Sequence, residues 1–95
     1  MRIRKTEIAE RDLKNIYRFG FERFGLAQTE VYAIELLDVI ELISLNPKMA
    51  REHFEYGQPV RIHPHRSHLI VYTIIENDLQ ILRVLSRHQN LVKHL

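Results

Sequence analysis

The sequence predicts an α+β fold in a single domain that spans residues 1–95. Apolar residues recur at three- and four-residue steps through the first half of the chain, which is typical of amphipathic helices. Later they alternate or run continuously over short segments, which is typical of strands. The expected order is an N-terminal strand, an antiparallel helical hairpin, a three-stranded antiparallel meander forming a small sheet, and a short C-terminal tail or helix.

The helical hairpin has clear start and stop signals. Residues 2–5 form the predicted first strand, and Thr6 can cap the helix that follows, with acidic side chains in its first turn. Gly25 ends this first helix, and the second runs from Leu26 to Leu45. The second helix is apolar around most of its circumference, so it must be covered on most sides. Asn46-Pro47 stops it, because the residue before proline disfavours the α region.

The second half of the chain predicts a loop and three strands. Residues 48–59 lack a period and contain glycine and proline, so we expect a loop there. Strands are expected at 60–63, with Pro64 at the end, at 68–76 and at 79–86, with Asn77-Asp78 as the last turn. Strict alternation along the last strand places one set of four side chains on one face, namely Leu79, Ile81, Arg83 and Leu85.

Composition narrows the functional classes. Cysteine is absent, so disulfide frameworks and thiolate catalysis are excluded. No apolar run approaches the roughly 20 residues that a membrane span needs, and the N-terminus lacks the apolar core of a signal peptide. Residues 1–47 hold seven basic and eight acidic side chains, whereas residues 48–95 hold seven and four. The basic second half favours a phosphate-bearing or acidic partner.

Histidine and arginine crowd the strand ends of the second half. All six histidines lie at or beyond His53. An endoribonuclease needs a proton acceptor, a proton donor and cations, and these residue types supply all three. The candidate residues are His63, His65, His68, His88, Arg61, Arg66, Arg83 and Arg87. The alternative is structural: exposed loop histidines, and arginines paired with Glu52, Glu55 or Glu76. The histidine spacing does not match a metal site, so neither a metal nor a cofactor is expected.

Arg83 and three aromatic residues of the second half each allow two interpretations, one functional and one structural. Arg83 interrupts an apolar strand, so it either reaches a partner or forms an internal salt bridge, for instance with Glu76 or a helix carboxylate. Tyr72, Phe54 and Tyr56 could stack on bases, but at these positions aromatic residues more often pack in a core or loop.

An ordered set of short motifs resembles a known family. The set comprises Asp12-Leu13, Ile16, Phe24-Gly25, Ala27, Tyr32, Leu45-Asn46-Pro47, Arg61, His68-Leu-Ile-Val-Tyr72 and Ile81-Leu-Arg83-Val-Leu85. With it, nearly the whole chain resembles the ParE toxins of bacterial type II toxin–antitoxin (plasmid-stabilisation) modules, within the RelE/ParE superfamily. The family fold is a helical hairpin packed on a small antiparallel sheet, in agreement with the order predicted from the residues.

The resemblance implies a cytoplasmic toxin neutralised by a ParD-like antitoxin, whose C-terminal segment wraps the hairpin and sheet. The toxin–antitoxin complex would bind operator DNA through the antitoxin. ParE members are described as inhibitors of DNA gyrase, whereas RelE-like relatives cut mRNA on the ribosome. The chain departs from the family pattern at Ser86, where a histidine often stands, and at Ala50-Arg51, which is often Gly-Arg. The complete Lys/Arg/Tyr set of the nucleases is absent, since no Tyr follows His88.

These observations favour a toxin that binds its target rather than an enzyme. The expected target contacts are Arg61, Arg66, His68, Arg83, Arg87 and His88. The expected antitoxin contacts are Leu13, Tyr17, Phe21, Ile34, Leu37 and Ile40. If the protein were an mRNA endonuclease, the catalytic candidates would be His63, His68, Arg83 and His88. A third reading is a non-toxic chain that serves as antitoxin-bound co-repressor.

Overall fold

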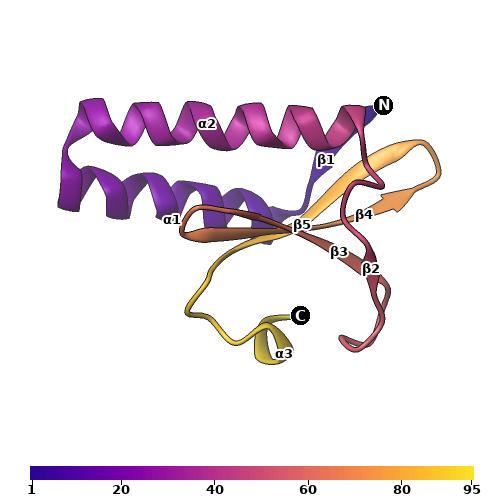
Figure 1. Ribbon diagram of the computed structural model, residues 1–95. Helices are drawn as coiled ribbons and strands as arrows, with labels where there is room; N and C mark the ends of the chain where they lie inside the picture. The colour runs from indigo at the N-terminus through magenta and orange to yellow at the C-terminus, as the bar shows by residue number, and fades with distance from the viewer.

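The computed structural model describes residues 1–95 and has two layers, a helical hairpin packed on a twisted sheet (Figure 1). A short C-terminal helix lies on the opposite side of the sheet. In chain order the elements are β1 (Arg2–Lys5), α1 (Glu7–Phe24), α2 (Leu26–Leu45), β2 (Glu52–His53), β3 (Val60–His65), β4 (His68–Ile75), β5 (Asp78–Ser86) and α3 (Leu91–His94). The predicted α+β class, the hairpin and the order of the long strands are confirmed.

The sheet is larger than the predicted meander and is mixed. Its strand order is β1-β5-β4-β3-β2. The β3–β4 and β4–β5 pairs are antiparallel as predicted, whereas β1 pairs with β5 in parallel. The 48–59 segment, predicted to be a loop throughout, contributes the two-residue strand β2 at the far edge. These pairings were missed because β1 and β2 are too short to show a period in the sequence.

Strand boundaries also differ from the prediction around proline and the last turn. β3 continues through Pro64, which pairs with Leu69, to His65. Beyond Arg61 this strand has no neighbour other than β4, and an edge strand tolerates proline because the missing N–H would have pointed away from the sheet. The β4–β5 turn consists of Glu76 and Asn77, with Glu76 at φ 55°, so Asp78 already belongs to β5.

Thr6 joins the start of α1 to the sheet. Its hydroxyl accepts a hydrogen bond from the backbone N–H of Ala9 (3.0 Å), which caps the helix, and donates to the carbonyl of Leu82 (2.8 Å). Its backbone N–H donates to the carbonyl of Ile81 (3.1 Å). The predicted N-cap residue therefore also attaches the start of α1 to the neighbouring strand β5.

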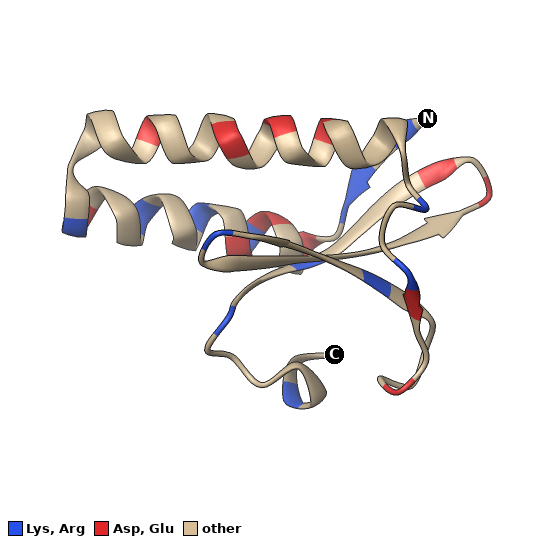
Figure 2. Cartoon of the chain, viewed as in Figure 1, with Lys and Arg blue, Asp and Glu red and all other residues tan.

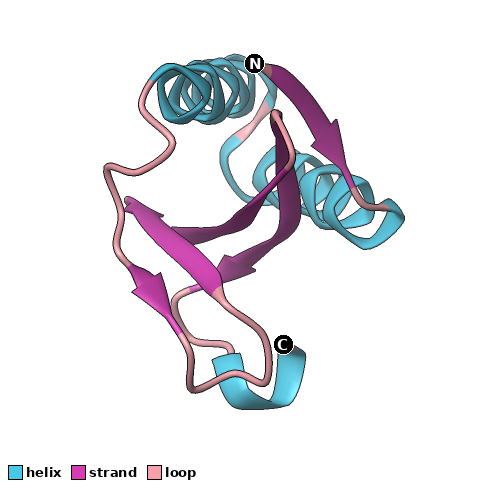
Figure 3. Ribbon diagram, turned by 90° about the vertical axis from the view of Figure 1, so that its right-hand side faces the viewer, coloured by secondary structure: helices cyan, strands magenta, loops and turns pink.

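Each face of the sheet has its own apolar core. The larger core lies under the hairpin and joins Leu36, Ile40 and Ile43 of α2 to buried side chains of β4 and β5. The smaller core, on the opposite face, consists of Val60, Val71 and Leu85, and α3 packs against it. Seen along the hairpin, the sheet lies between the two long helices and the short one (Figure 3). Neither long helix is apolar enough over its length to cross a membrane.

A β-bulge overturns the predicted alternation on β5. Tyr72 pairs with Ile81 and Val71 pairs with Arg83, so Leu82 has no partner of its own on β4. One extra residue in a strand shifts the side chains that follow to the other face. Ile81 therefore lies in the larger core while Leu85 lies in the smaller one, although the sequence predicted both on one face.

The two long helices pack closely at Gly20. A Cβ atom at this position would lie 3.0 Å from Oγ1 and 3.3 Å from Cγ2 of Thr29, which is 5% exposed. A side chain on α1 at this position would therefore press against Thr29 of α2.

We expect the substitution Gly20→Val to destabilise the protein by about 1–3 kcal/mol, because the added side chain forces the helices apart. Urea denaturation would measure the loss. Adding Thr29→Ala should recover most of it, because the space is restored. A Gly20→Val protein as stable as the wild type would contradict the close contact.

Candidate functional site

A polar cluster joins the β3–β4 hairpin to α2. The hydroxyl of Tyr32 lies 2.6 Å from Nδ1 of His68, and it lies 3.4 Å from the carbonyl oxygen of His65. The Tyr32 ring stacks on the ring of His65, with centroids 5.8 Å apart. α2 thus places one aromatic side chain between two histidines that pair across the hairpin.

Burial decides the protonation states in this cluster. It raises the pKa of Tyr32, so the phenol keeps its proton. Burial, aided by the nearby His65, lowers the pKa of His68, so this imidazole stays neutral. A protonated hydroxyl and a neutral ring nitrogen share one hydrogen bond, whose donor is the Tyr32 hydroxyl or the Nδ1–H of His68 according to the tautomer of the ring. His68 is therefore a hydrogen-bonded structural group as well as a candidate contact.

Glu35 is the charged member of the cluster. Its carboxylate lies 3.0 Å from Nε of Arg66, at the hairpin turn. It lies 3.5 Å from Nε2 of His65, but without hydrogen-bond geometry, and that nitrogen is buried without a partner. Arg66 is thus held by an internal carboxylate while 65% of its side chain stays exposed.

A groove of about 1290 Å³ opens beside this cluster, between the hairpin and the end of the sheet. Arg66, His68 and His88 belong to its polar wall, and Leu13 and Tyr17 of α1 belong to its apolar wall. Part of the predicted target set and part of the predicted antitoxin set therefore share one cleft. An apolar groove with cationic walls suits a segment that carries apolar and acidic side chains.

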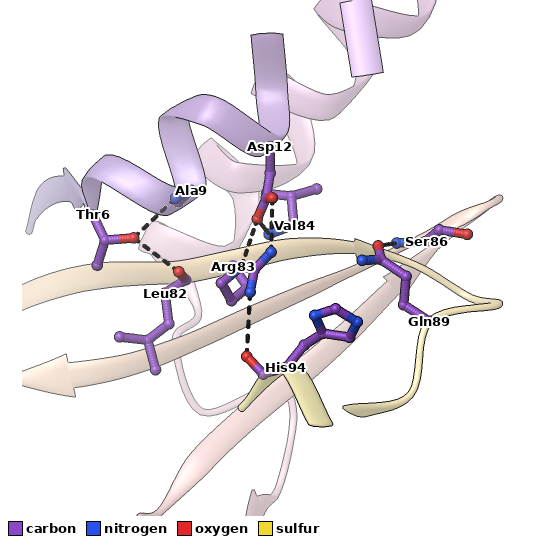
Figure 4. A network of polar contacts seen from close by, with 9 residues as sticks. All are labelled: Thr6, Ala9, Asp12, Leu82, Arg83, Val84, Ser86, Gln89 and His94. Atoms are coloured by element: carbon purple, nitrogen blue, oxygen red, sulfur yellow. Dashed lines mark hydrogen bonds and ion pairs between the residues drawn. The ribbon is translucent and has the colours of Figure 1, made fainter. Parts of the chain in front are cut away.

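Arg83 is bound inside the fold (Figure 4). Its Nε and Nη2 donate to the two carboxylate oxygens of Asp12 (2.8 and 3.0 Å), and Nη1 donates to the carbonyl of His94 (3.2 Å). Asp12 also accepts from the backbone N–H of Val84 (3.0 Å). The hydrogen-bonded carboxylate raises the pKa of Arg83. Of the two interpretations of this residue, the internal salt bridge is the one found, and of the suggested partners it is a helix carboxylate, Asp12 of α1, rather than Glu76.

The other predicted target contacts do not form one surface. Arg61 lies at the opposite end of β3 from the groove, where it bonds the Ala50 carbonyl and lies 3.7 Å from Glu52. Arg87 bonds the backbone carbonyl of Arg66, next to the groove. Of the four nuclease candidates, His68 and His88 line the groove, whereas His63 is half-buried on β3 and Arg83 is paired with Asp12 within β5.

Most of the predicted antitoxin contacts are on the surface of the hairpin. Tyr17, Phe21, Ile34 and Leu37 are exposed, and Leu13 is half-buried. Ile40 is an exception at 2% exposure, since it lies in the larger core. Its inclusion was wrong because α2 is apolar around most of its circumference, so the sequence does not distinguish Ile40 on the inner face from exposed residues such as Ile34 and Leu37.

Comparison with known proteins assigns the chain to a family. A family model described as the ParE toxin of the type II toxin–antitoxin system parDE matches residues 3–91. The chain belongs to the ParE toxin family. Toxin ParE1 of Caulobacter vibrioides is 30% identical over 92 residues, which cover 97% of this chain and 95% of ParE1. A solved structure described as the chromosomal ParDE TA system from P. aeruginosa shares the fold, with a TM-score of 0.77, 19% identity, and coverage of 90% and 95%.

Two residues that organise this ParE-family chain were not singled out as site residues from its sequence. Asp12 neutralises Arg83, and Tyr32 joins the two histidines. Asp12 could have been recognised because it lies next to Leu13 in the apolar stripe of α1. A carboxylate that this stripe brings close to the sheet needs a cationic partner. Tyr32 carried no comparable signal, because an aromatic residue in an apolar helix is ordinarily core.

The lowered pKa of His68 predicts that this ParE-family toxin loses stability in mild acid. An unfolded histidine titrates near about 6.5, and burial lowers the pKa of His68 and of His63 in the fold. As the pH falls below about 6.5, the unfolded state binds protons first, so the free energy of unfolding decreases by at most about 1.4 kcal/mol per pH unit for each histidine.

Urea denaturation between pH 7.5 and 5 measures this slope. The substitution His68→Gln keeps a polar side chain of similar reach and removes one titrating group. We expect it to reduce the slope. An unchanged slope in this variant would contradict the assignment of the pH dependence to His68.

Proposed function

We propose that this chain is a growth-arresting toxin of a type II module, that a ParD-like antitoxin neutralises it, and that it binds DNA gyrase rather than cutting RNA. The observation that carries the antitoxin part is the exposed apolar surface of the hairpin at Tyr17, Phe21, Ile34 and Leu37. Four large apolar side chains on one helical pair are expensive to leave in water, so a partner that covers them gains free energy. Membership of the ParE family supports a toxin.

The antitoxin contact is tested by charge insertion on the hairpin. We expect Phe21→Asp and Leu37→Asp each to weaken binding of the co-encoded antitoxin. Val92→Asp on α3 is the matched control, because Val92 is equally apolar and 74% exposed but lies on the other side of the sheet. Equal effects of all three substitutions would sink the assignment to the hairpin.

Binding rather than turnover is supported by the state of the candidate catalytic groups. His68 is held neutral by burial and hydrogen-bonded to Tyr32, and Arg83 is neutralised by Asp12. A contact of either residue with a bound RNA would therefore compete with the Tyr32–His68 hydrogen bond or the Asp12–Arg83 pair. The target contacts proposed for gyrase are residues beside the groove, namely Arg66, Arg87 and His88, with His68 in its wall. Arg61 lies apart from them.

One experiment separates this proposal from its alternatives. The toxin is expressed without antitoxin, and DNA supercoiling by gyrase and the ends of cellular mRNAs are measured in the same cells. Inhibited supercoiling with intact mRNA supports the gyrase proposal. Codon-positioned mRNA cuts with normal supercoiling would support a RelE-like endonuclease instead. Unimpaired growth would support the co-repressor reading.

A cytoplasmic location and a higher-order complex belong to the same proposal. The complex would bind operator DNA through the antitoxin, as the resemblance to the family implies. Electrophoretic mobility shift with the module's promoter DNA tests this. Binding by the toxin alone, at physiological salt, would contradict it.

A further inference from the structure

The outward side of α2 combines large apolar side chains with carboxylates. Its buried side carries Thr29, Leu36, Ile40 and Ile43. Helical periodicity places another series on the opposite side. The outward series is Val31, Ile34, Asp38, Leu42 and Leu45, flanked by Glu30 and Glu41. The four apolar members are 47–76% exposed, and all three carboxylate residues are exposed.

All the charge on α2 is negative. No Lys or Arg occurs between residues 24 and 47, and α2 shows acidic positions alone, whereas α1 carries both signs (Figure 2). Glu35 is the exception among its carboxylates in having ion-pair partners, His65 and Arg66. Glu30, Asp38 and Glu41 take part in none of the ion pairs of the fold.

This arrangement is unfavourable for the isolated chain. Asp38 and Glu41 are three residues apart on one helix, as are Glu35 and Asp38, and like charges at this spacing destabilise a helix. α1 compensates its dipole with acidic residues in the first turn and Arg23 in the last, but α2 has neither. Glu41 instead adds a negative charge near the negative end of the helix. Packing inside the toxin gives no reason for this pattern.

We propose that the outward side of α2 binds an amphipathic segment of the antitoxin that is rich in Lys and Arg. Its apolar side chains cover Val31, Ile34, Leu42 and Leu45, and its cations neutralise Glu30, Asp38 and Glu41. The inference rests on the proposed function, in which an antitoxin covers the hairpin, and it adds the chemistry of the covering segment. It also gives the toxin two complementary surfaces, since the groove lined by Lys14, Arg23 and Arg66 suits acidic side chains.

The same charges argue against other occupants of this face. A second copy that packed α2 against α2 would bring carboxylates of the same helix together, which is unfavourable. Nucleic acid is polyanionic and would be repelled. A cationic apolar segment satisfies both features of the surface at once.

The test uses the double charge reversal Asp38→Lys with Glu41→Lys. Because it removes like-charge repulsion and places cations near the C-terminal end of α2, we expect the free toxin to be at least as stable as the wild type. The same change should weaken the complex with the co-encoded antitoxin about tenfold. The matched control is Glu22→Lys with Glu76→Lys, which makes the same change in net charge at exposed positions off α2. It should leave the affinity unchanged.

A pair of synthetic peptides tests the chemistry directly. Both are amphipathic helices with leucines at identical positions, and the polar side of one carries Lys where the other carries Glu. The wild-type toxin should bind the Lys peptide about tenfold more tightly, with the difference shrinking in high salt. The charge-reversed toxin should prefer the Glu peptide.

The outcomes separate this inference from the proposed function. If the antitoxin binds wild-type and charge-reversed toxin equally well and still neutralises both, the inference is overturned and the proposed function stands. Equal binding of the two peptides also overturns the inference, as does a wild-type toxin that forms dimers through α2. If the wild-type toxin does not bind its co-encoded antitoxin at all, the proposed function itself fails.

Discussion

Replacing Asp12 with alanine is expected to lower the free energy of unfolding by about 3 kcal/mol, because it leaves the guanidinium of Arg83 without a counter-charge in a mostly buried position. The side chains of Arg83 and Asp12 are 17% and 13% exposed. Asp12 also accepts the backbone N–H of Val84, so the substitution leaves a second donor without a partner. Urea denaturation measures the loss.

The fold contains a matched control for this prediction. Arg4 and Asp78 form an ion pair with the same Nε–Oδ2 distance of 2.8 Å, but their side chains are 53% and 28% exposed. We expect Asp78→Ala to cost less than about 1 kcal/mol, because water already screens this pair. Equal losses in the two variants would contradict the view that burial makes the Asp12–Arg83 pair important.

The same pair should also control α3. Arg83 bonds the carbonyl of His94 while it is held by Asp12, so α1, β5 and α3 meet at one guanidinium. Hydrogen exchange in the Asp12→Ala variant should therefore be faster in residues 91–95 than in the wild type, with little change in β3. Exchange that increases uniformly would show that only global stability had changed.

Replacing Tyr72 with alanine is expected to cost about 3–5 kcal/mol, the range for removing a large aromatic side chain from a core. Tyr72 is fully buried under the hairpin, and its hydroxyl donates to the carbonyl of Pro47 (2.8 Å). Burial raises the pKa of this phenol, so it stays a donor. A residue in this position cannot stack on a base, which removes Tyr72 from the candidate nucleic-acid contacts.

The variant Tyr72→Phe separates packing from the hydrogen bond. It keeps the ring and should cost only about 1 kcal/mol, the net value of one hydrogen bond. Because Pro47 ends α2, this bond also anchors the start of the 46–51 segment to β4. A Phe variant as unstable as the Ala variant would show that the hydrogen bond, rather than the packed ring, holds this corner.

The helices could be predicted well because their signals are local. Thr6 caps the first helix and Gly25, at φ 85°, ends it, while Asn46-Pro47 stops the second. The three long strands were equally visible in runs of apolar residues. β1–β5 pairing was not, because it joins residues about 76 positions apart in the chain and no local pattern specifies a partner strand.

The candidate site was harder to predict than the fold. The crowding of His and Arg correctly marked the β3–β4 hairpin, where His65, Arg66 and His68 meet α2. Sequence could not show that Tyr32 and Glu35 would bind them, nor that Arg83 would be neutralised by a residue 71 positions earlier. The hydrogen-bond partners and charge states of these side chains depend on distances in the folded chain, which cannot be read from the order of residues in the sequence.

By itself the sequence determined the fold class, the hairpin, the long strands and the ParE resemblance, since each follows from periodicity, caps or ordered motifs along the chain. Only the tertiary structure decided which side of α2 is buried, because that helix is apolar around most of its circumference and its polar stripe is too narrow to orient it. It likewise decided, through the bulge at Leu82, which core receives Leu85. The exposed carboxylates of α2 and the neutralised Arg83 both follow from these long-range contacts, because packing between distant segments determines which charges reach a partner.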